Sequence, residues 1–296
     1  MITIDLCTFD PGVAAQSPAA FAAAVTDCVE SSWNNGADLV LLPEFTWVGL
    51  EPLVEPRTLQ RVAEVFWDEV LPGLKSLLLR PGKAVVLGTA PFWDAERQEL
   101  RNRAPILVED RVLFQDKLHL TPWESEFSSG TALHLWEFAG LRFAVVICLD
   151  IEIPEISTRL RGAGVDVMLV PSATETVLGV ERVGRCASAR AVELGCVVGV
   201  CHLTGRAVTD LIDVNVGRTA VYFPSQAAFR EAPRCKESDI FESGIQKQRL
   251  MVDRKLLQVM RRMPLETNPS LLKKMPAFEL VRADSAQDSG LGFRLM

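Results

Sequence analysis

Cys148 stands where an apolar run gives way to acidic residues, in the segment 143-FAVVICLDIEIPE-155. A thiol acts as a nucleophile only as the thiolate, or with a base within reach to take its proton. The usual role of a buried cysteine is structural packing. The end of a strand is instead a position from which a nucleophile can reach a ligand. Asp150 would then position the turn that follows Cys148. Both interpretations stay open for this segment alone.

Glu44 lies between apolar neighbours and beside a proline, in 41-LLPEFTW-47. Poor solvation raises the pKa of a carboxyl group toward the range of a useful general base. A solvated loop glutamate or a helix cap is the alternative.

Lys117 occurs in 114-FQDKLHLTPWESEF-127, where it alternates with leucines in a strand expected at 111–119. In such a strand Lys117 and His119 share one face. A half-buried lysine could stabilise an oxyanion, whereas a lysine on an edge strand could simply discourage aggregation. Of Glu124 and Glu126 in the following loop, one is expected to point inward and the other to be solvated.

The elements that must position these residues alternate between strand and helix. Strands are predicted at 2–9, 38–44, 83–89, 103–108, 111–119, 133–138, 141–148, 165–170 and 196–203. Helices are predicted at 17–33, 57–79, 154–163 and 179–194, the first capped by Ser17 and the second disturbed near Pro72 and Gly73. Long apolar strands indicate sheets covered on both faces, so the fold class is α/β or a related layered sandwich. Ligands in such folds bind at strand ends.

Two segments resemble each other, 36-GADLVLLPEFT-46 and 164-GVDVMLVPSAT-174. Each has a glycine, an aspartate, a buried strand and a proline, followed by a polar residue. The repeat predicts two similar halves packed together, although chance similarity between buried strands is the alternative. No linker separates the halves, which favours one domain.

The order Glu, Lys, Glu, Cys resembles the nitrilase, or carbon–nitrogen hydrolase, superfamily. The matching pieces are 42-LPEF-45, 116-DKLHL-120 with Glu124, and 147-ICLDIEIPE-155, supported by 170-VPSAT-174 and 189-ARAVELG-195. The resemblance covers about residues 1–260 and implies a four-layer αββα sandwich in a domain of residues 1–262. Residues 263–296 would then form a C-terminal extension, either packed on a partner subunit or a disordered end.

The resemblance also implies residue roles. Cys148 would be the nucleophile and Glu44 the general base, while Lys117 and the backbone N–H of Leu149 would stabilise the oxyanion. The second glutamate would be Glu124, with Glu126 as the fallback. No metal or organic cofactor is implied, and a homodimer or larger assembly is expected.

The predicted reaction is cleavage of a small amide, nitrile or N-carbamoyl compound through a cysteine thioester, giving a carboxylic acid and ammonia or an amine. Acyl transfer to an amine stays open. The family's asparagine after the post-cysteine strand is replaced here by 172-SATET-176, so the substrate of a known subgroup cannot be carried over. Substrate contacts are predicted for six residues, with core packing as the alternative for the aromatic ones. These residues are Trp47, Trp123, Phe127, Ser172, Ala173 and Thr174.

Two other functions compete with this prediction. One is a Cys–His thiol acyl hydrolase or transferase that pairs Cys148 with His119, His134 or His202. The other is a non-catalytic binding subunit. Serine hydrolysis is disfavoured because no GxSxG motif is present, and no Walker A motif indicates nucleotide binding.

Composition excludes several further classes. The 296 residues carry 31 basic and 38 acidic side chains, a net charge of −7, with no basic stripe for nucleic acid or an anionic membrane. The start, 1-MITIDLCTFD-10, lacks the features of a signal peptide, and no apolar run approaches the ~18 residues of a membrane span. Seven cysteines without a CxxC pair are expected to be reduced thiols in a cytoplasmic protein.

Overall fold

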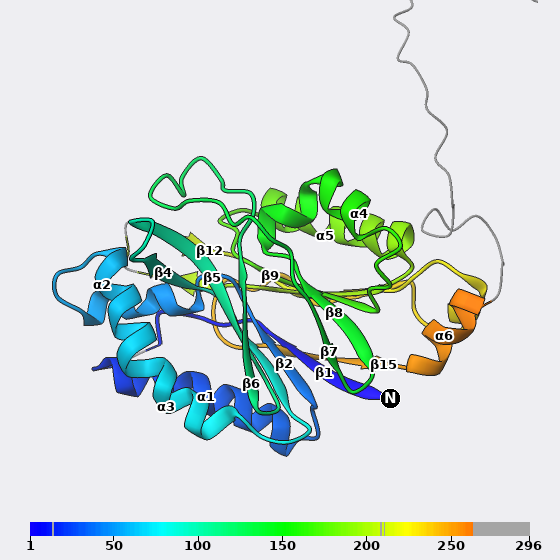
Figure 1. Cartoon of the computed structure of the whole chain (residues 1–296), viewed down its shortest axis with the longest axis horizontal. Coiled ribbons are helices and arrows are strands. Elements are labelled where there is room, and N and C mark those ends of the chain that lie inside the picture. The colour runs from blue at the N-terminus through cyan, green and yellow to red at the C-terminus, as the bar shows by residue number, and fades with distance from the viewer. Residues whose placement is uncertain (14, 208, 210, 263–296) are drawn as a thin grey trace, which may run out of the picture.

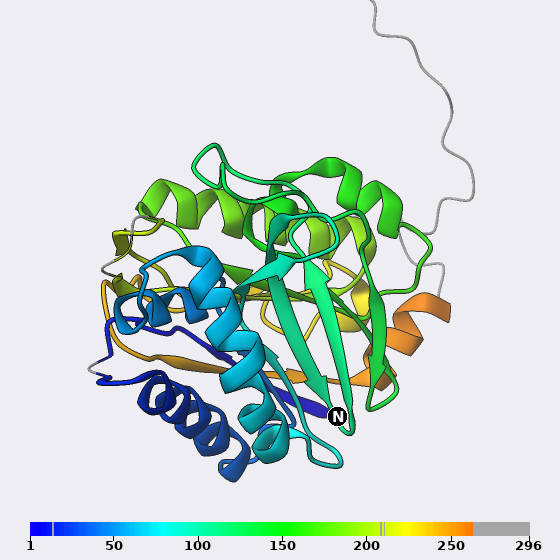
Figure 2. The ribbon, with the colours of Figure 1, turned by 60° about the vertical axis from the view of Figure 1, so that its left-hand side comes forward.

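Two β-sheets stacked face to face form the centre of the molecule in this computed structural model, which describes residues 1–262 apart from 14, 208 and 210 (Figure 1). The helices α1 (Pro18–Asn34) and α3 (Leu71–Leu78) cover the outer face of one sheet, and α4 (Pro154–Leu160) and α5 (Val177–Leu194) cover the other. The same layers are visible after rotation (Figure 2). The predicted αββα sandwich is confirmed.

The first sheet has the order β15-β1-β2-β3-β5-β4, with β6 pairing β5. Its strands are β1 (Ile2–Cys7), β2 (Leu39–Leu42), β3 (Ala84–Leu87), β4 (Ala90–Asp94), β5 (Glu99–Val108), β6 (Arg111–Asp116) and β15 (Lys247–Val252). Because β1, β2 and β3 are parallel, their carboxyl ends meet at one edge of the sheet. The residues that follow these strands, Glu44 among them, therefore lie at this edge.

The second sheet has the order β14-β13-β10-β9-β8-β7. Its strands are β7 (Leu135–Phe138), β8 (Leu141–Val145), β9 (Val167–Ser172), β10 (Val197–His202), β13 (Thr219–Tyr222) and β14 (Cys235–Glu237). Here β8, β9 and β10 are parallel. A separate two-stranded pair, β11 (Gly205–Arg206) with β12 (Val214–Asn215), follows β10.

The inner faces of the two sheets form the main core. Strands β1, β2, β8, β9 and β10 are buried along most of their length, as expected for sheets covered on both sides. Gly199 on β10 allows the sheets to approach closely, because a Cβ there would lie 2.9 Å from Leu6 of β1. The resembling segments at 36–46 and 164–174 occupy corresponding places, one in each sheet.

The helix predicted at 57–79 forms with an irregularity. It consists of α2 (Leu59–Glu64), a π-helical segment Val65–Val70 and α3. Pro72 provides the physical reason, since proline has no N–H to donate and its ring crowds the preceding turn. Gly73, by contrast, continues the helix.

Other boundaries differ from prediction. The strand predicted at 111–119 ends at Asp116, so Lys117 and His119 do not share a strand face. Strand β4 was not predicted, and β5 begins at Glu99, four residues before the expected start at 103. The weakly periodic part after 206 includes β15, which pairs antiparallel with β1, and α6 (Arg254–Arg262). The predicted extension 263–296 lies outside the described residues.

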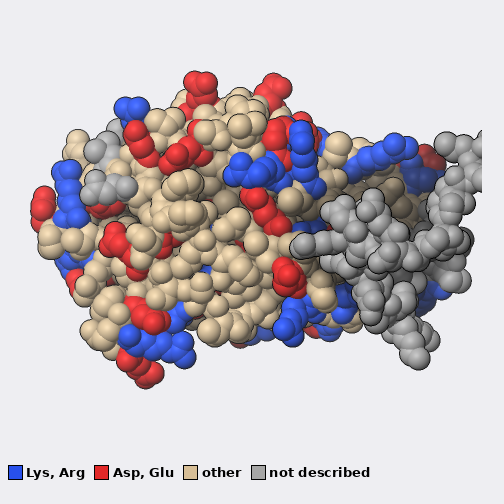
Figure 3. All heavy atoms as spheres, turned by 90° about the horizontal axis from the view of Figure 1, so that it is seen from above, with Lys and Arg blue, Asp and Glu red and all other residues tan. Residues whose placement is uncertain are grey.

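The outer surface over α4 and α5 carries acidic and basic groups side by side (Figure 3). None of the described helices combines the length and apolar character required to cross a membrane.

Candidate active site

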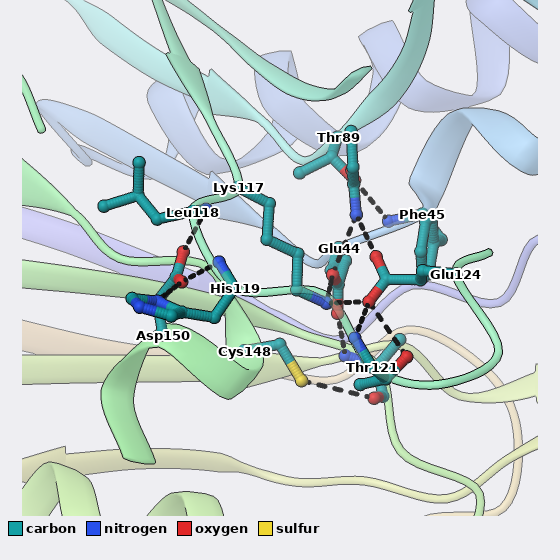
Figure 4. Close-up of polar contacts among 12 residues, drawn as sticks. Glu44, Phe45, Thr89, Lys117, Leu118, His119, Thr121, Glu124, Cys148 and Asp150 are labelled. Atoms are coloured by element: carbon teal, nitrogen blue, oxygen red, sulfur yellow. Dashed lines mark hydrogen bonds and ion pairs between the residues drawn. The ribbon is translucent and has the colours of Figure 1, made fainter. Parts of the chain in front are cut away.

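The four residues expected to perform chemistry come together where the two sheets end (Figure 4). Glu44 follows β2, Lys117 follows β6, and Cys148 follows β8 at the start of a 3₁₀ turn, Cys148–Glu152. Glu124 comes from the loop after β6. Lys117 and both glutamates are 1% exposed, and Cys148 is 6% exposed. The first sheet thus supplies the charged groups and the second supplies the thiol.

Lys117 bridges the two carboxylates. Its Nζ lies 2.7 Å from Glu44 Oε1 and 2.6 Å from Glu124 Oε2. Two buried carboxylates without a cation would repel each other and force one to bind a proton. The lysine offsets that repulsion and holds both side chains in place.

Asn102 on β5 also contacts both carboxylates, and it was not among the predicted site residues. Its Nδ2 donates to Glu44 Oε1 and to Glu124 Oε1, each at 3.0 Å. The signal in the sequence is a single asparagine between arginines in 99-ELRNRAPILV-108, a strand that is otherwise largely buried. A neutral amide can satisfy two carboxylates at once without adding charge.

Glu124 rather than Glu126 is the inward glutamate. Thr121 donates to Glu124 Oε2 through both its N–H and its Oγ1, each at 2.9 Å. Glu126 is exposed to solvent. The choice left open by the sequence is therefore settled by geometry, with Thr121 as a further member of the site.

The backbone of Ala173 links the nucleophile candidate to the base candidate. Cys148 Sγ donates to the Ala173 carbonyl oxygen at 3.5 Å, and the Ala173 N–H donates to Glu44 Oε2 at 3.1 Å. The two successive peptide units that flank Ala173, directly after β9, therefore position both groups. Cys148 has φ 46°, in the left-handed region that side-chain-bearing residues rarely adopt. Such strain is found where a fold holds a functional group in a set position.

The β2 end is fixed by the strand end beside it. Phe45 also has a left-handed φ of 59°, and its N–H donates to Thr89 Oγ1 at 2.8 Å. Gly88 has φ 70°, and a Cβ there would lie 2.2 Å from the Pro43 carbonyl oxygen. Only glycine fits such a close approach, so Gly88 allows the segment carrying Glu44 to pack against the end of β3.

Burial controls the protonation of the site. It raises the pKa of Glu44 to about 7, although the Lys117 charge acts in the opposite direction. Burial, followed by the Glu44 charge, also raises the pKa of Cys148 above its ordinary value. For Lys117, burial would lower the pKa, but neighbouring acidic groups, Glu44 foremost, raise it above the ordinary value. The resting site thus combines a neutral thiol, a firmly protonated lysine and a carboxyl group suited to accept a proton near neutral pH.

Asp150 joins the turn after Cys148 to the segment after Lys117. Its carboxylate accepts from the backbone N–H groups of Leu118 at 3.1 Å and His119 at 2.7 Å. The His119 Nδ1 lies 2.8 Å from the same carboxylate. The positioning role expected for Asp150 therefore extends to Lys117 as well as to the turn.

A cavity of about 350 Å³ opens beside these groups. Its lining includes the predicted residues Glu44, Lys117, Trp123, Glu124, Cys148, Leu149, Ala173 and Thr174. The remaining lining residues are Phe45, Thr121, Glu152, Glu175, Thr176, Gly179, Arg182, Leu211, Ile212 and Asn215. Within the described part of the chain, the lining excludes three residues predicted to contact substrate, namely Trp47, Phe127 and Ser172.

Each of these three corrections has a packing explanation. Trp47 is fully buried on the helix side, with its ring tilted against Phe66 at a centroid distance of 4.6 Å, and its Nε1 donates to the Leu87 carbonyl oxygen. Phe127 packs 6.3 Å from Phe45 in a separate small core. Ser172 is fully buried within β9. Proximity in sequence to a site residue did not predict the direction of these side chains.

The alternative of a thiol–histidine pair is not supported, because within the described residues no histidine is placed to act with Cys148. None of the three histidines lines the cavity. His119 is held by Asp150, and His202 is buried with its Nδ1 2.8 Å from the Arg218 carbonyl oxygen. In the same described residues, no group of three or more His, Cys, Asp or Glu side chains is placed to hold a metal ion.

The fold is that of the nitrilase superfamily. A model of the carbon–nitrogen hydrolase family matches residues 11–248, and the chain therefore belongs to this family.

Two curated relatives are similar over part of their length. A probable hydrolase, YhcX, of Bacillus subtilis (strain 168) is 27% identical over 218 residues, which are 71% of this chain and 42% of that protein. An (R)-stereoselective amidase of Pseudomonas sp. is 32% identical over 135 residues, 45% of this chain and 47% of that protein. The matched parts thus span less than half of either relative.

Solved structures share the fold across nearly the whole described chain. The amidase from Nesterenkonia sp. AN1 superposes with a TM-score of 0.68 at 19% identity, covering 88% of this chain and 97% of that one. That structure is of a mutant of the amidase, in which acrylamide has added to the active-site cysteine. Saccharomyces cerevisiae Nit3 superposes with a TM-score of 0.67 at 21% identity, covering 90% and 96%.

Proposed function

We propose that the protein hydrolyses a small amide to a carboxylic acid and ammonia or an amine, through a thioester on Cys148. The observation that carries this proposal is the backbone of Ala173, whose carbonyl oxygen accepts from the Cys148 thiol and whose N–H donates to the Glu44 carboxylate. A nucleophile with a raised pKa needs an adjacent base, and the base here has a pKa of about 7. The names of the amidase relatives support an amide rather than a nitrile.

In the first half-reaction, Cys148 Sγ attacks the amide carbon and its proton passes to Glu44. The oxyanion that forms accepts hydrogen bonds from Lys117 Nζ and the Leu149 N–H. The carbon–nitrogen bond then breaks, and the leaving nitrogen takes the proton from Glu44. The enzyme is left with an acyl group bound to sulfur.

In the second half-reaction, Glu44 takes a proton from water, and the resulting hydroxide attacks the thioester carbon. The carbon–sulfur bond breaks, the sulfur recovers its proton, and the carboxylic acid leaves. Glu124 and Asn102 have no proton to transfer in this scheme. They hold Lys117 and Glu44 in the geometry that both half-reactions use.

The direct test is ammonia release from simple amides, ω-amides, N-carbamoyl amino acids and nitriles. Wild type should release ammonia from amides, and Cys148→Ala should release none. Cys235→Ala is the matched control, because Cys235 is exposed on β14 and should leave the rate unchanged. Intact-mass analysis of wild type quenched with acid during turnover should detect an acyl group on Cys148, and Cys148→Ala should show none. Full activity of Cys148→Ala would contradict the proposal.

We also propose that the protein forms a homodimer in the cytoplasm. Exposed apolar side chains on α5, Val177 at 51% and Leu178 at 72%, support an interface on this helix. Light scattering of the purified chain would test it, and a monomer at micromolar concentration would contradict it.

A further inference from the structure

Asn215 at the end of β12 is fully buried and lines the cavity beside Cys148. Neither its Oδ1 nor its Nδ2 has a hydrogen-bond partner within the part of the chain that the structure describes. Unpaired buried amide groups are rare in folded proteins, because each loses its hydrogen bonds to water without replacement. Asn215 therefore brings an unpaired donor and an unpaired acceptor to the wall of the cavity.

Backbone contacts fix Asn215 in the same wall as the reacting groups. The next residue, Val216, donates its N–H to the Thr174 carbonyl oxygen at 2.9 Å and accepts from Thr174 Oγ1 at 2.9 Å. Thr174 directly follows Ala173, whose carbonyl and N–H contact Cys148 and Glu44. An acyl group bonded to Cys148 would thus have Asn215 in the wall around it.

The remaining lining near Asn215 is apolar or acidic. Leu211, Ile212 and Phe45 provide apolar contacts. Four carboxylates line the cavity, Glu44, Glu124, Glu152 and Glu175, against two cations, Lys117 and Arg182. Arg182 is itself engaged, with its Nε 3.3 Å from Glu152. A substrate bearing a carboxylate would meet net repulsion here, whereas an uncharged polar group would not.

We propose that Asn215 is a specificity-determining residue that binds a second, uncharged carboxamide on the acyl chain, so that the preferred substrates are neutral diamides. A carboxamide presents one acceptor and one donor side by side, and it can therefore satisfy both atoms of the Asn215 amide. This inference rests on the proposed amide hydrolysis and names the substrate class of that same site.

The test compares kcat/KM for three compounds of similar shape, by ammonia release from wild type and Asn215→Leu. Succinamide has a distal carboxamide, isocaproamide has an isopropyl group in its place, and succinamate has a carboxylate there. Wild type should prefer succinamide to isocaproamide by about tenfold or more, since an unpaired buried amide disfavours the apolar compound. Succinamate should be the poorest substrate. Asn215→Leu should lose the preference while cleaving isocaproamide at least as well as wild type.

Asn34→Leu is the matched control, because Asn34 is exposed on α1, and its ratio of succinamide to isocaproamide should equal that of wild type. If Asn215→Leu does not fold, Asn215→Ala is judged by the same ratio.

An unchanged ratio in the Asn215 variant would overturn the inference and leave amide hydrolysis standing. Equal cleavage of succinamate and succinamide by wild type would overturn the preference for an uncharged group. Failure of wild type to cleave any amide would overturn the proposed function itself.

Discussion

The strands β2 and β9 end in similar sequences, LLPEFT and LVPSAT, but contribute different chemistry to the site. After β2, Glu44 places a buried carboxylate against Lys117. At the corresponding place in β9 stands Ser172, whose hydroxyl has no partner in the described residues, and Ala173 follows it. Ala173 contributes only its peptide N–H and carbonyl.

The comparison shows that a repeated strand-end geometry can supply either a side chain or the backbone. The β2 end depends on one particular residue type, because only a carboxylate can act as the base. The β9 end depends on where a peptide lies, which many side chains permit. We therefore expect substitutions at the two ends to differ greatly in effect.

Glu44→Gln should have the largest effect, lowering kcat/KM by about a thousandfold or more, because the amide cannot accept the thiol proton. The amide also cannot accept all three hydrogen bonds that Glu44 receives from Ala173, Lys117 and Asn102, so the melting temperature should fall below that of wild type. Steady-state kinetics and a melting curve would check both points. Activity above a tenth of wild type would show that another group is the base.

Lys117→Gln should lower kcat by about a hundredfold to a thousandfold through loss of oxyanion stabilisation. It should also lower the free energy of unfolding by about 3–5 kcal/mol, because two buried carboxylates lose their cation. The loss should be smaller in acid, where a carboxyl group can bind a proton. Urea unfolding at two pH values would measure this. If only KM rose, the oxyanion role would be wrong.

The pH profile should follow Glu44. Its pKa of about 7 means that the base is ionised above this pH and protonated below it. Consequently kcat/KM should fall as the pH falls through 7, approaching about tenfold per pH unit on the acid side. A flat profile from about pH 8 to pH 6 would contradict the assignment of Glu44 as the base.

Asn102→Leu should have a smaller effect, about tenfold on kcat, because Asn102 positions the carboxylates without contacting the reacting atoms. Loss of its N–H donor destabilises ionised Glu44, so the acid limb of the pH profile should move to higher pH. A purely structural role would not move that limb. Equal losses at all pH values, with no shift, would therefore refute a positioning role.

Ser172→Ala should have the smallest effect. The Ser172 hydroxyl is buried without a partner in the described chain, so its removal should leave kcat within about twofold and stability within ~0.5 kcal/mol. Kinetics and thermal unfolding would check this. A large loss of activity would mean that the β9 end also acts through a side chain, and the contrast with β2 would fail.

Local patterns in the sequence predicted the alternation of buried strands with helices, whereas the four layers and the complete set of site residues followed from the family resemblance. Buried strands read as apolar runs, and Glu44 and Cys148 stand directly after such runs. Lys117 and Glu124 were identified by their order and by the family resemblance rather than by their surroundings. The predicted strand to 119 was too long, since the apolar alternation continues through Leu118 and Leu120 after the backbone has left the sheet.

Contacts between distant elements were not predictable in the same way. Asn102 is an ordinary polar residue in sequence, and its importance arises only because β5 passes beside both carboxylates. Trp47 and Phe127 are near Glu44 and Glu124 in sequence, yet Trp47 packs into the core on the helix side and Phe127 packs against Phe45, so neither ring lines the cavity. Which face of a turn a side chain occupies depends on the packing of neighbouring layers, and a single sequence does not contain that information.

The exposed indole of Trp123 at the cavity has a practical consequence. It is 72% exposed, unlike the buried Trp47, and it lines the same cavity as Cys148. Indole emission responds to the polarity around the ring. The protein therefore carries its own fluorescent reporter of cavity occupancy, and stopped-flow emission could follow ligand entry separately from the release of ammonia.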